Sequence, residues 1–432
     1  MNESHKSKQV ASHSPQLKEF NLEKNKYKIT EQNTLPLSGL VAKYGINKSD
    51  ILFAILRPSN GSGYHRWLVG ISLEKGILWE YKHPDFSPDE LRIAANGDAY
   101  ISSGNEIQQV DENGQLQKSI TFELALDQTI GSFVLIEEGF LLAIEGNDQP
   151  NAKVLRTNLN GEIVWESPIS PKGIAYKGVV QMRATNNWQV EEKPPWQPRS
   201  WNCLINNEII VSGENVLVSY HEFPGSGVGM SFCLHIKTGA IQWTTKPAPF
   251  ESVCGLKDGK FLIGHQGYGA FDMDLFDTDG KIIESWASAG KAVVNSHEQI
   301  FAIEMDNRSS SKLHFVALKK ERKVKKGKRI PGYYIIYPVL DDLGNVVFWR
   351  DNTLMIIDKE GKLHTPFSLT PTDRDWTSNR MLLHQRGTLV FSVNDNLYVL
   401  KTNLGSLEQS AWACQCANNE RNPVIKAKSN PT

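Results

Sequence analysis

In this 432-residue chain, two histidines and two glutamates have the side chains and the spacing to form a catalytic or metal-binding site. His221 and His265 are 44 residues apart, and each follows a short apolar segment, as Glu145 and Glu304 also do. Two imidazoles and two carboxylates that meet in space can ligate a divalent metal or act as acid and base. We therefore take all four as candidate catalytic residues and the two histidines as candidate metal ligands. The alternative is that each histidine is a structural residue at a strand end.

Tryptophan and arginine in irregular polar segments form a second group of candidates, because these side chains are favoured anchors in binding sites. The segment 182–201 carries three tryptophans among proline, asparagine and arginine, and its prolines oppose strand pairing. The segment 370–376 has the same character. The alternative is that these loops fold down onto the body of the protein as a plug. The candidate ligand-binding residues, some from these loops and some from the ends of apolar segments, are Arg57, Trp188, Trp196, Trp201, Trp349, Arg350, Arg374 and Trp376.

The elements that must position these residues repeat along the chain. An apolar strand, a polar turn with glycine and a second strand that often closes on tryptophan recur, as in Leu155–Trp165 and Leu234–Trp243. Each copy predicts a β-hairpin, because glycine beside asparagine or aspartate supplies the positive φ that a tight turn needs. The turn glycines are Gly76, Gly114, Gly161, Gly239, Gly280, Gly361 and Gly405.

The spacing of these hairpins is typical of propeller blades, which repeat every 40 to 50 residues or so with four strands each. Two intervals are about twice as long, and one of them holds a degenerate copy in Ile300–Glu304 and Leu313–Leu318. An apolar run before each hairpin, such as Ile51–Leu56, suits a buried inner strand. We predict an all-β fold, a single β-propeller of eight four-stranded antiparallel blades, with seven blades as the alternative. Unrelated meanders in a sandwich would not give this regular spacing.

The blade topology predicts where function would lie. In an antiparallel meander the loop after the second strand and the loop to the next blade emerge on the same face, so the candidates above converge at one mouth of the central channel. We expect a propeller over residues 34–412 with an insertion at 182–201, and flexible segments at 1–33 and 413–432. The expected function is a binding or scaffold protein that recognises a small molecule or a peptide at this mouth. The alternatives are a lyase-type or hydrolase-type enzyme on the same face, and a solvated polar rim.

Composition narrows the partners and the compartment. The chain has 47 Lys and Arg against 48 Asp and Glu, so no net field attracts nucleic acid or an anionic membrane, and we expect neither as a partner. Five cysteines argue against a disulfide framework and fit a reducing compartment. No run is apolar and long enough for a secretory signal or a membrane helix. We therefore expect a cytoplasmic location.

The repeat resembles that of the quinoprotein-like (PQQ-repeat-like) β-propeller superfamily, best in Asn160–Trp165 and Thr238–Trp243, over residues 50–412 or so. The resemblance implies that the repeated tryptophan packs between blades. Quinone-dependent dehydrogenases of that superfamily use a vicinal Cys-Cys disulfide, a calcium site and export. The nearest cysteines here are Cys414 and Cys416, which are not adjacent. We expect no cofactor, with a divalent metal as the alternative.

Overall fold

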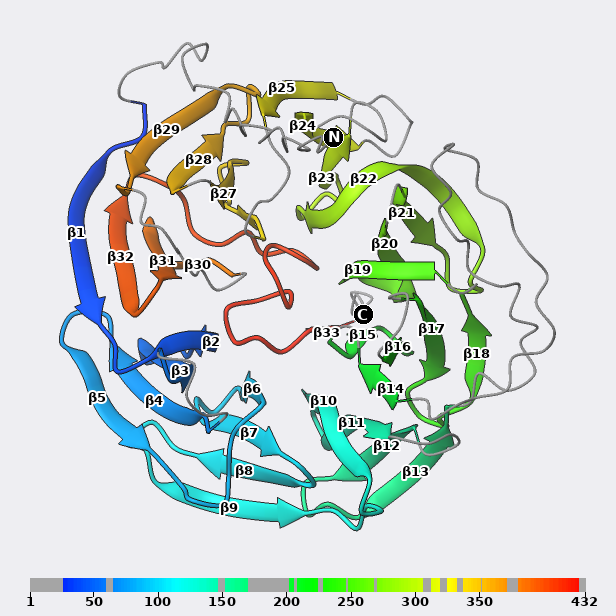
Figure 1. The fold of residues 1–432 in the computed structure, drawn as a ribbon. Helices are drawn as coiled ribbons and strands as arrows, with labels where there is room; N and C mark the ends of the chain where they lie inside the picture. The colour runs from blue at the N-terminus through cyan, green and yellow to red at the C-terminus, as the bar shows by residue number, and fades with distance from the viewer. Residues whose placement is uncertain are drawn as a thin grey trace, which may run out of the picture.

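Strands form at the continuous apolar runs and at the segments where apolar and polar residues alternate, and they are arranged as a ring of antiparallel blades around a central channel (Figure 1). The computed structural model describes residues 26–59, 65–146, 152–169, 202–205, 208–223, 228–245, 248–267, 270–305, 312–318, 325–331, 337–350, 352–370 and 380–426. The predicted all-β propeller is confirmed. Among the described residues the helical element is a short 3-10 turn, η1 (Lys257–Gly259).

Among the described residues four blades are separate four-stranded sheets, and three of these are built from four consecutive strands, the first of which lies nearest the channel (Figure 1). One contains β2 (Leu40–Ile46), β3 (Ile51–Arg57), β4 (Trp67–Ser72) and β5 (Gly76–Tyr81). The next contains β6 (Glu90–Ile93), β7 (Ala99–Ser103), β8 (Glu106–Val110) and β9 (Leu116–Thr121). The third contains β26 (Val339–Leu340), β27 (Val346–Arg350), β28 (Thr353–Ile357) and β29 (Leu363–Ser368).

A 17-stranded sheet joins the meanders on the other side of the ring. Its first meander contains β10 (Gln128–Ile136), β11 (Gly139–Gly146), β12 (Lys153–Asn158) and β13 (Ile163–Pro168). The next contains β14 (Asn202–Ile205), β15 (Ile210–Ser212), β16 (Asn215–Phe223), β17 (Val228–His235) and β18 (Ile241–Thr244). The last two share a strand and contain β19 (Ala248–Gly255), β20 (Phe261–Gly267), β21 (Ala270–Phe276), β22 (Ile282–Val294), β23 (Ile300–Met305), β24 (Lys312–Leu318) and β25 (Lys325–Pro331).

Strand β14 decides how the blades are counted. It pairs with β16 and, through Cys203, with Gly146 of β11, so β10–β13 and β15–β18 form one joined sheet. Within the described residues, counting this joined sheet once gives seven blades, and counting its two meanders separately gives eight. The sequence predicted eight blades, with seven as the alternative. With the sheet joined by β14 counted as one blade, the alternative of seven holds and the prediction of eight is off by one.

The N-terminal strand closes the ring. β30 (Leu382–His384), β31 (Thr388–Val393) and β32 (Asn396–Thr402) form the last blade, and its outermost strand is β1 (Ile29–Pro36). Two expectations are corrected. The predicted hairpin around Gly405 does not form, because β1 from the other end of the chain pairs with β32 in its place. The segment before residue 34 is also not wholly flexible, since it contributes most of β1.

The repeated tryptophans interlock neighbouring blades, as the resemblance implied. The indole of Trp79 in β5 lies over Gly114 in the next blade, and its Nε1 donates to the carbonyl of Glu112 at 2.8 Å. Trp165 contacts Gly239 in the same way, with an Nε1 bond of 2.9 Å to the next blade. The turn glycines at 76, 114, 161, 239, 280 and 361 all have positive φ.

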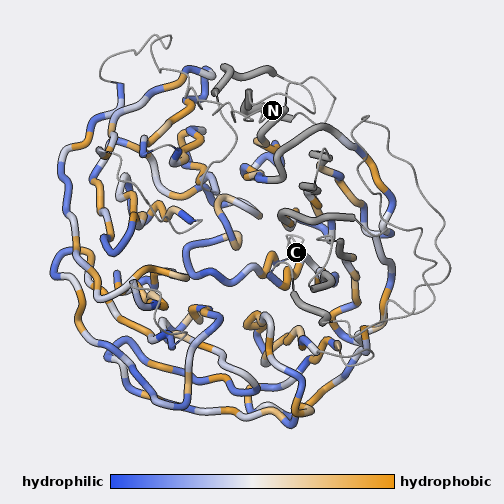
Figure 2. The backbone as a smooth tube through the Cα atoms, viewed as in Figure 1, coloured by the Kyte–Doolittle hydropathy of each residue, from blue (hydrophilic) through white to orange (hydrophobic). Residues whose placement is uncertain are grey.

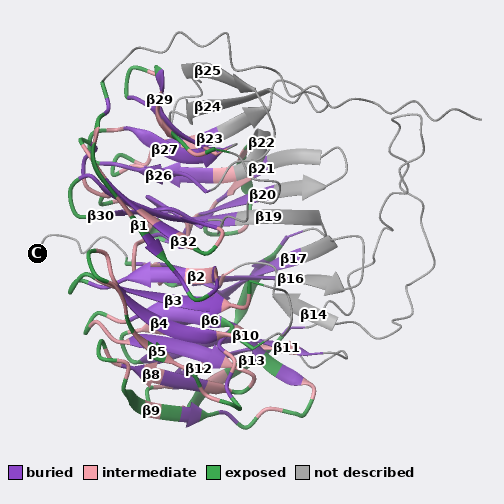
Figure 3. Cartoon of the chain, turned by 60° about the vertical axis from the view of Figure 1, so that its left-hand side comes forward, coloured by how far each residue is buried: buried purple, intermediate pink, exposed green. Residues whose placement is uncertain are grey.

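Burial follows the order of strands in a blade. The second strands are buried along nearly their whole length, as in β3 and β27, whereas the outermost strand β9 is largely exposed (Figure 3). Apolar residues recur along the strands of every described blade, and the segment that crosses the channel is largely hydrophilic (Figure 2). The core therefore lies between blades rather than in the channel. No described residue belongs to a helix long and apolar enough to cross a membrane.

The chain after β32 crosses the end of the channel (Figure 1, red) and ends in β33 (Val424–Ile425), which pairs in parallel with β15. Its carbonyls at 412, 413, 419 and 420 accept hydrogen bonds of 2.8–3.1 Å from the ends of four inner strands. Trp412 and Cys414 are buried. The prediction of a flexible tail from residue 413 is therefore wrong for residues 413–426. This segment lacks periodicity because backbone hydrogen bonds hold it, not an alternating strand face.

Candidate functional site

The four candidate catalytic residues lie on second strands, as the hairpin pattern predicted. Glu145 is in β11, His221 in β16, His265 in β20 and Glu304 in β23, so they occupy four consecutive meanders. Glu145 is half-buried over Gly131. The side chains of the other three lie outside the described part of the structure, so the proposed metal and acid–base set stays a prediction. Among the described side chains no group of three or more His, Cys, Asp or Glu is arranged to hold a metal.

The candidate ligand-binding residues divide into two sets. Arg57 and Arg350 end the second strands β3 and β27. Trp349 is 2% exposed and its ring lies 4.6 Å from that of Phe391, so its observed contacts are those of blade packing. The remaining candidates, Trp188, Trp196, Trp201, Arg374 and Trp376, lie outside the described residues.

The structure places a group of charged side chains inside the channel that sequence reasoning missed. We call it the channel cluster: Lys43 of β2, Glu90 and Arg92 of β6, Glu208 before β15, and Arg421 of the C-terminal segment. Glu90 pairs with Lys43 and, at 3.0 Å, with Arg92. Glu208 bridges Arg92 and Arg421. The group therefore links two inner strands to the segment that closes the channel.

Burial and charge set the electrostatics of the channel cluster. The side chain of Arg92 is fully buried, and it also donates to the carbonyl of Leu91 at 2.7 Å. Burial raises the pKa of Glu208, but Arg92 and Arg421 outweigh this effect and hold it well below its usual range. Burial lowers the pKa of Lys43 to about 7; Glu208 opposes this shift, while Arg421 and Arg92 increase it. Glu208 is therefore firmly ionised, whereas Lys43 can change charge near neutral pH.

One signal in the sequence could have indicated part of this group. Glu90 and Arg92 alternate with apolar residues in a short inner strand, so both face the same side. Charges on a strand that lines the channel point into it. Arg421 gave no such signal, because it lies in a segment without strand periodicity.

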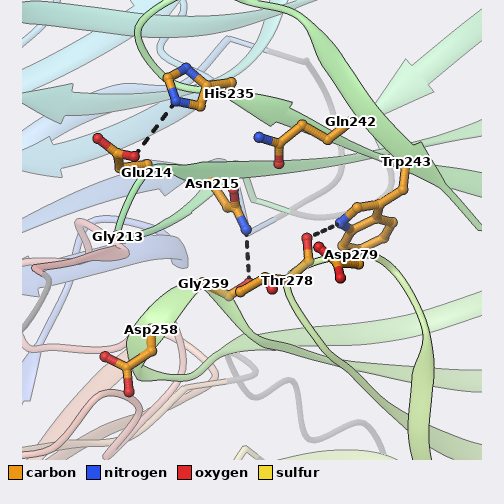
Figure 4. A pocket seen from close by; sticks show the side chains of 10 residues that line it. All are labelled: Gly213, Glu214, Asn215, His235, Gln242, Trp243, Asp258, Gly259, Thr278 and Asp279. Carbon is orange, nitrogen blue, oxygen red and sulfur yellow. Dashed lines mark hydrogen bonds and ion pairs between the residues drawn. The ribbon is translucent and has the colours of Figure 1, made fainter.

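A cavity of about 580 Å³ lies between the β15–β18 and β19–β22 blades, on the face opposite the ends of the second strands (Figure 4). Glu214 pairs there with His235 at 3.7 Å and with Lys237 at 2.7 Å. Asn215 donates to the carbonyl of Gly259 at 3.0 Å, and Trp243 Nε1 donates to the carbonyl of Thr278 at 2.9 Å. These two bonds cross from one blade to the next. The cavity is therefore lined by the contacts that hold the blades together.

Comparison with known proteins identifies the fold. No protein-family description matches the chain, and no curated protein sequence is similar to it. The Dos1 propeller has 12% sequence identity and a TM-score of 0.55, over 87% of this chain and 95% of that chain. A quinohemoprotein alcohol dehydrogenase from Comamonas testosteroni has 11% identity and a TM-score of 0.55, over 88% and 76%. The WD40 domain of SCAP from fission yeast has 10% identity and a TM-score of 0.51, over 86% and 94%. The chain thus resembles quinoprotein-like and other propellers at the level of the blade.

Proposed function

We propose that the protein is a β-propeller binding protein that recognises a small molecule or a peptide at the channel mouth formed by the ends of the second strands. The observation that carries the proposal is the C-terminal segment. It occupies the other end of the channel, where its carbonyls accept hydrogen bonds from the inner strands. A ligand of the channel would therefore approach from the face of Glu145, His221 and His265. The mouth of a propeller suits such a role because loops from many blades converge there.

The compartment is part of the same proposal. Cys233, Cys254, Cys414 and Cys416 are unpaired and buried. Burial raises the pKa of Cys233, Cys254 and Cys414 to about 12, so these thiols are poor nucleophiles. Unpaired thiols support a reducing compartment such as the cytoplasm. The proposed partners are small molecules, peptides or proteins, and not nucleic acid or a membrane.

A specific observation keeps an enzyme as the second candidate. The two histidines and two glutamates lie at second-strand positions in consecutive meanders, which would let them surround one point at the channel mouth. An enzyme of this kind would use them with a divalent metal as a lyase or a hydrolase. Metal analysis of the purified protein separates the two candidates. A stoichiometric divalent ion that His221→Ala removes would favour the enzyme, and protein without metal would favour the binding protein.

The test of the binding site uses a thermal-shift screen of small molecules and peptides on the full chain, followed by two variants. We expect His265→Ala and Trp196→Ala to abolish most of the ligand-induced shift. The stability of the ligand-free protein should change by less than about 1 kcal/mol, because neither side chain is expected to be central to blade packing. Residues 319–329 form a basic segment that the blade topology predicts on the opposite face. Full ligand binding in both variants, together with its loss on substitutions in this segment, would place the site on that face.

A further inference from the structure

The channel cluster does not balance its own charge. Lys43, Arg92 and Arg421 are cationic, and they face the carboxylates of Glu90 and Glu208. With every group ionised, one positive charge is left over in a largely buried place, where an uncompensated charge is costly. A protein can relieve that cost by releasing a proton or by binding an anion. Burial lowers the pKa of Lys43 to about 7, so the ammonium of Lys43 is the group that releases its proton most easily.

Lys43 is the accessible cation of the channel cluster. The side chains of Arg92, Arg421 and Glu90 are 0%, 5% and 7% exposed, whereas those of Lys43 and Glu208 are 24% and 20% exposed. Among the described residues, the ammonium of Lys43 has Glu90 as its one ion-pair partner. An ammonium has three N–H donors, and Glu90 does not occupy all of them. The Lys43 ammonium can therefore also donate to an acceptor from outside the chain. The two arginines also each keep an Nε without a described partner.

We propose that the channel cluster binds a carboxylate of the ligand, with the ammonium of Lys43 as its direct partner. This inference rests on the proposed function, because it names the chemistry by which the channel recognises its ligand. A monoanion balances the single excess charge. A dianion such as sulfate would overcompensate it and would approach the carboxylates of Glu90 and Glu208, so the site favours a carboxylate over sulfate.

The proposal has a defined pH dependence. Lys43 faces Glu90 and Arg92 from β6, Glu208 from the chain before β15, and Cys416 and Arg421 from the C-terminal segment. The carboxylate binds the protonated ammonium, so binding is strongest below the pKa of Lys43. It weakens as the pH rises through neutrality. Bound carboxylate in turn raises this pKa, because an opposite charge favours the ionised form.

The experiment measures the stabilisation of the full chain by sodium acetate at constant ionic strength, at pH 6.0 and pH 8.5. Chloride and sulfate serve as reference anions, and the Tm shift of Lys43→Met in each salt is subtracted to remove general salt effects. We expect the remaining shift at pH 6.0 to be larger with acetate than with either reference, and to fall several-fold at pH 8.5. Lys43→Met should abolish the acetate effect at both values. Lys43→Arg, which stays charged, should keep it at pH 8.5. The matched control Lys75→Met changes an exposed lysine and should behave like the unaltered protein.

The outcomes separate this inference from the proposed function. Equal acetate effects in the unaltered protein and in Lys43→Met would overturn it, as would equal Lys43-dependent effects of acetate and sulfate. If a screened ligand is lost in His265→Ala but kept in Lys43→Met, the channel mouth binds it without this carboxylate contact, and only the further inference fails. Short peptides with a free or an amidated C-terminus distinguish a peptide carboxylate from a small free acid. Stabilisation by the free form alone identifies a peptide terminus, and stabilisation by acetate but neither peptide identifies a small acid.

Discussion

Lys43 is the residue whose charge state sets the stability of the channel. Its pKa is about 7 in the folded protein against 10.5 for a free lysine, so the folded state binds fewer protons between these values. Stability therefore rises with pH from about 7 towards 10.5, and the cost of the buried charge is fully present below pH 7.

Lys43→Met removes the cost of the buried charge. The free energy of unfolding of this variant, relative to that of the unaltered protein, should therefore be highest at pH 6. This relative gain should shrink by about 3 kcal/mol by pH 9, since the two units between pH 7 and pH 9 correspond to about 1.4 kcal/mol each. Urea unfolding at the two pH values measures the difference. A difference independent of pH would show that Lys43 keeps an ordinary pKa.

Glu208 holds two arginines in place, and its removal should be far more damaging. Glu208→Gln would remove the carboxylate that lies nearest to both Arg92 and Arg421, and would leave them Glu90 at 3.0 and 3.7 Å. Breaking a buried ion pair from one side costs about 3–5 kcal/mol. The control is Glu214→Gln, which loses an exposed pair with Lys237 and should cost less than about 1 kcal/mol. Similar losses in both variants, measured by urea unfolding, would argue against a buried network.

Single residues were predictable from the sequence where a local pattern placed them. The second-strand positions of Glu145 and His265 followed from the hairpin that comes after each apolar run. The channel cluster did not follow, because Lys43, Arg92, Glu208 and Arg421 come from distant parts of the chain and meet only when the ring closes. Trp349 was also not identifiable as a packing residue, since its contact with Phe391 joins neighbouring blades.

At the scale of the element, the turn glycines have two separable roles. Gly280 has a φ of 77°, and a Cβ there would lie 2.4 Å from Cγ of Trp243. Gly361 has a φ of 81°, but a Cβ there would meet nothing within 4 Å. The first glycine meets a conformational and a steric requirement, and the second only the conformational one.

Gly361→Ala should therefore cost about 1 kcal/mol, which is the usual penalty of a side chain at positive φ. Gly280→Ala should cost clearly more, about 2–4 kcal/mol, because the methyl group also displaces the indole that joins two blades. Thermal and urea unfolding of the two variants test this order. Equal losses would mean that the indole moves aside without cost and that the interlock contributes little.

Elements were predictable where strand partners are close in sequence. The hairpins at 155–165 and 234–243 formed as expected, because each turn carries its own signal. The expected hairpin at Gly405 failed because the partner of β32 is β1, more than 350 residues away along the chain. No local pattern distinguishes a strand that pairs forward from one that pairs with the other end of the chain.

For the whole molecule, the ring is closed twice. β1 pairs with β32 at the outer edge, and the C-terminal segment binds the ends of inner strands at the channel. Repetition predicted the propeller, because each blade needs neighbours to bury its faces. The binding of the C-terminal segment could not be predicted, because it depends on backbone hydrogen bonds and on the buried side chain of Arg380. This side chain donates to the carbonyls of Gln415 and Asn418 at 2.8 and 2.5 Å.

The second closure predicts that the C-terminal segment is required for a stable ring. Truncation after Asn403 removes Trp412, Arg421 and β33, together with carbonyls that accept hydrogen bonds from several inner-strand N–H groups and from Arg380, so we expect a large loss of Tm or insoluble protein. Truncation after Lys426 removes none of these contacts and should leave the Tm unchanged. If the shorter chain does not fold, Trp412→Ala gives the answer. Its indole is 2% exposed and donates to Tyr337 Oη at 3.0 Å, so its loss should cost about 3–5 kcal/mol in urea unfolding. Near-normal stability of both the Asn403 truncation and Trp412→Ala would mean that the segment is a dispensable cover and that β1 alone closes the ring.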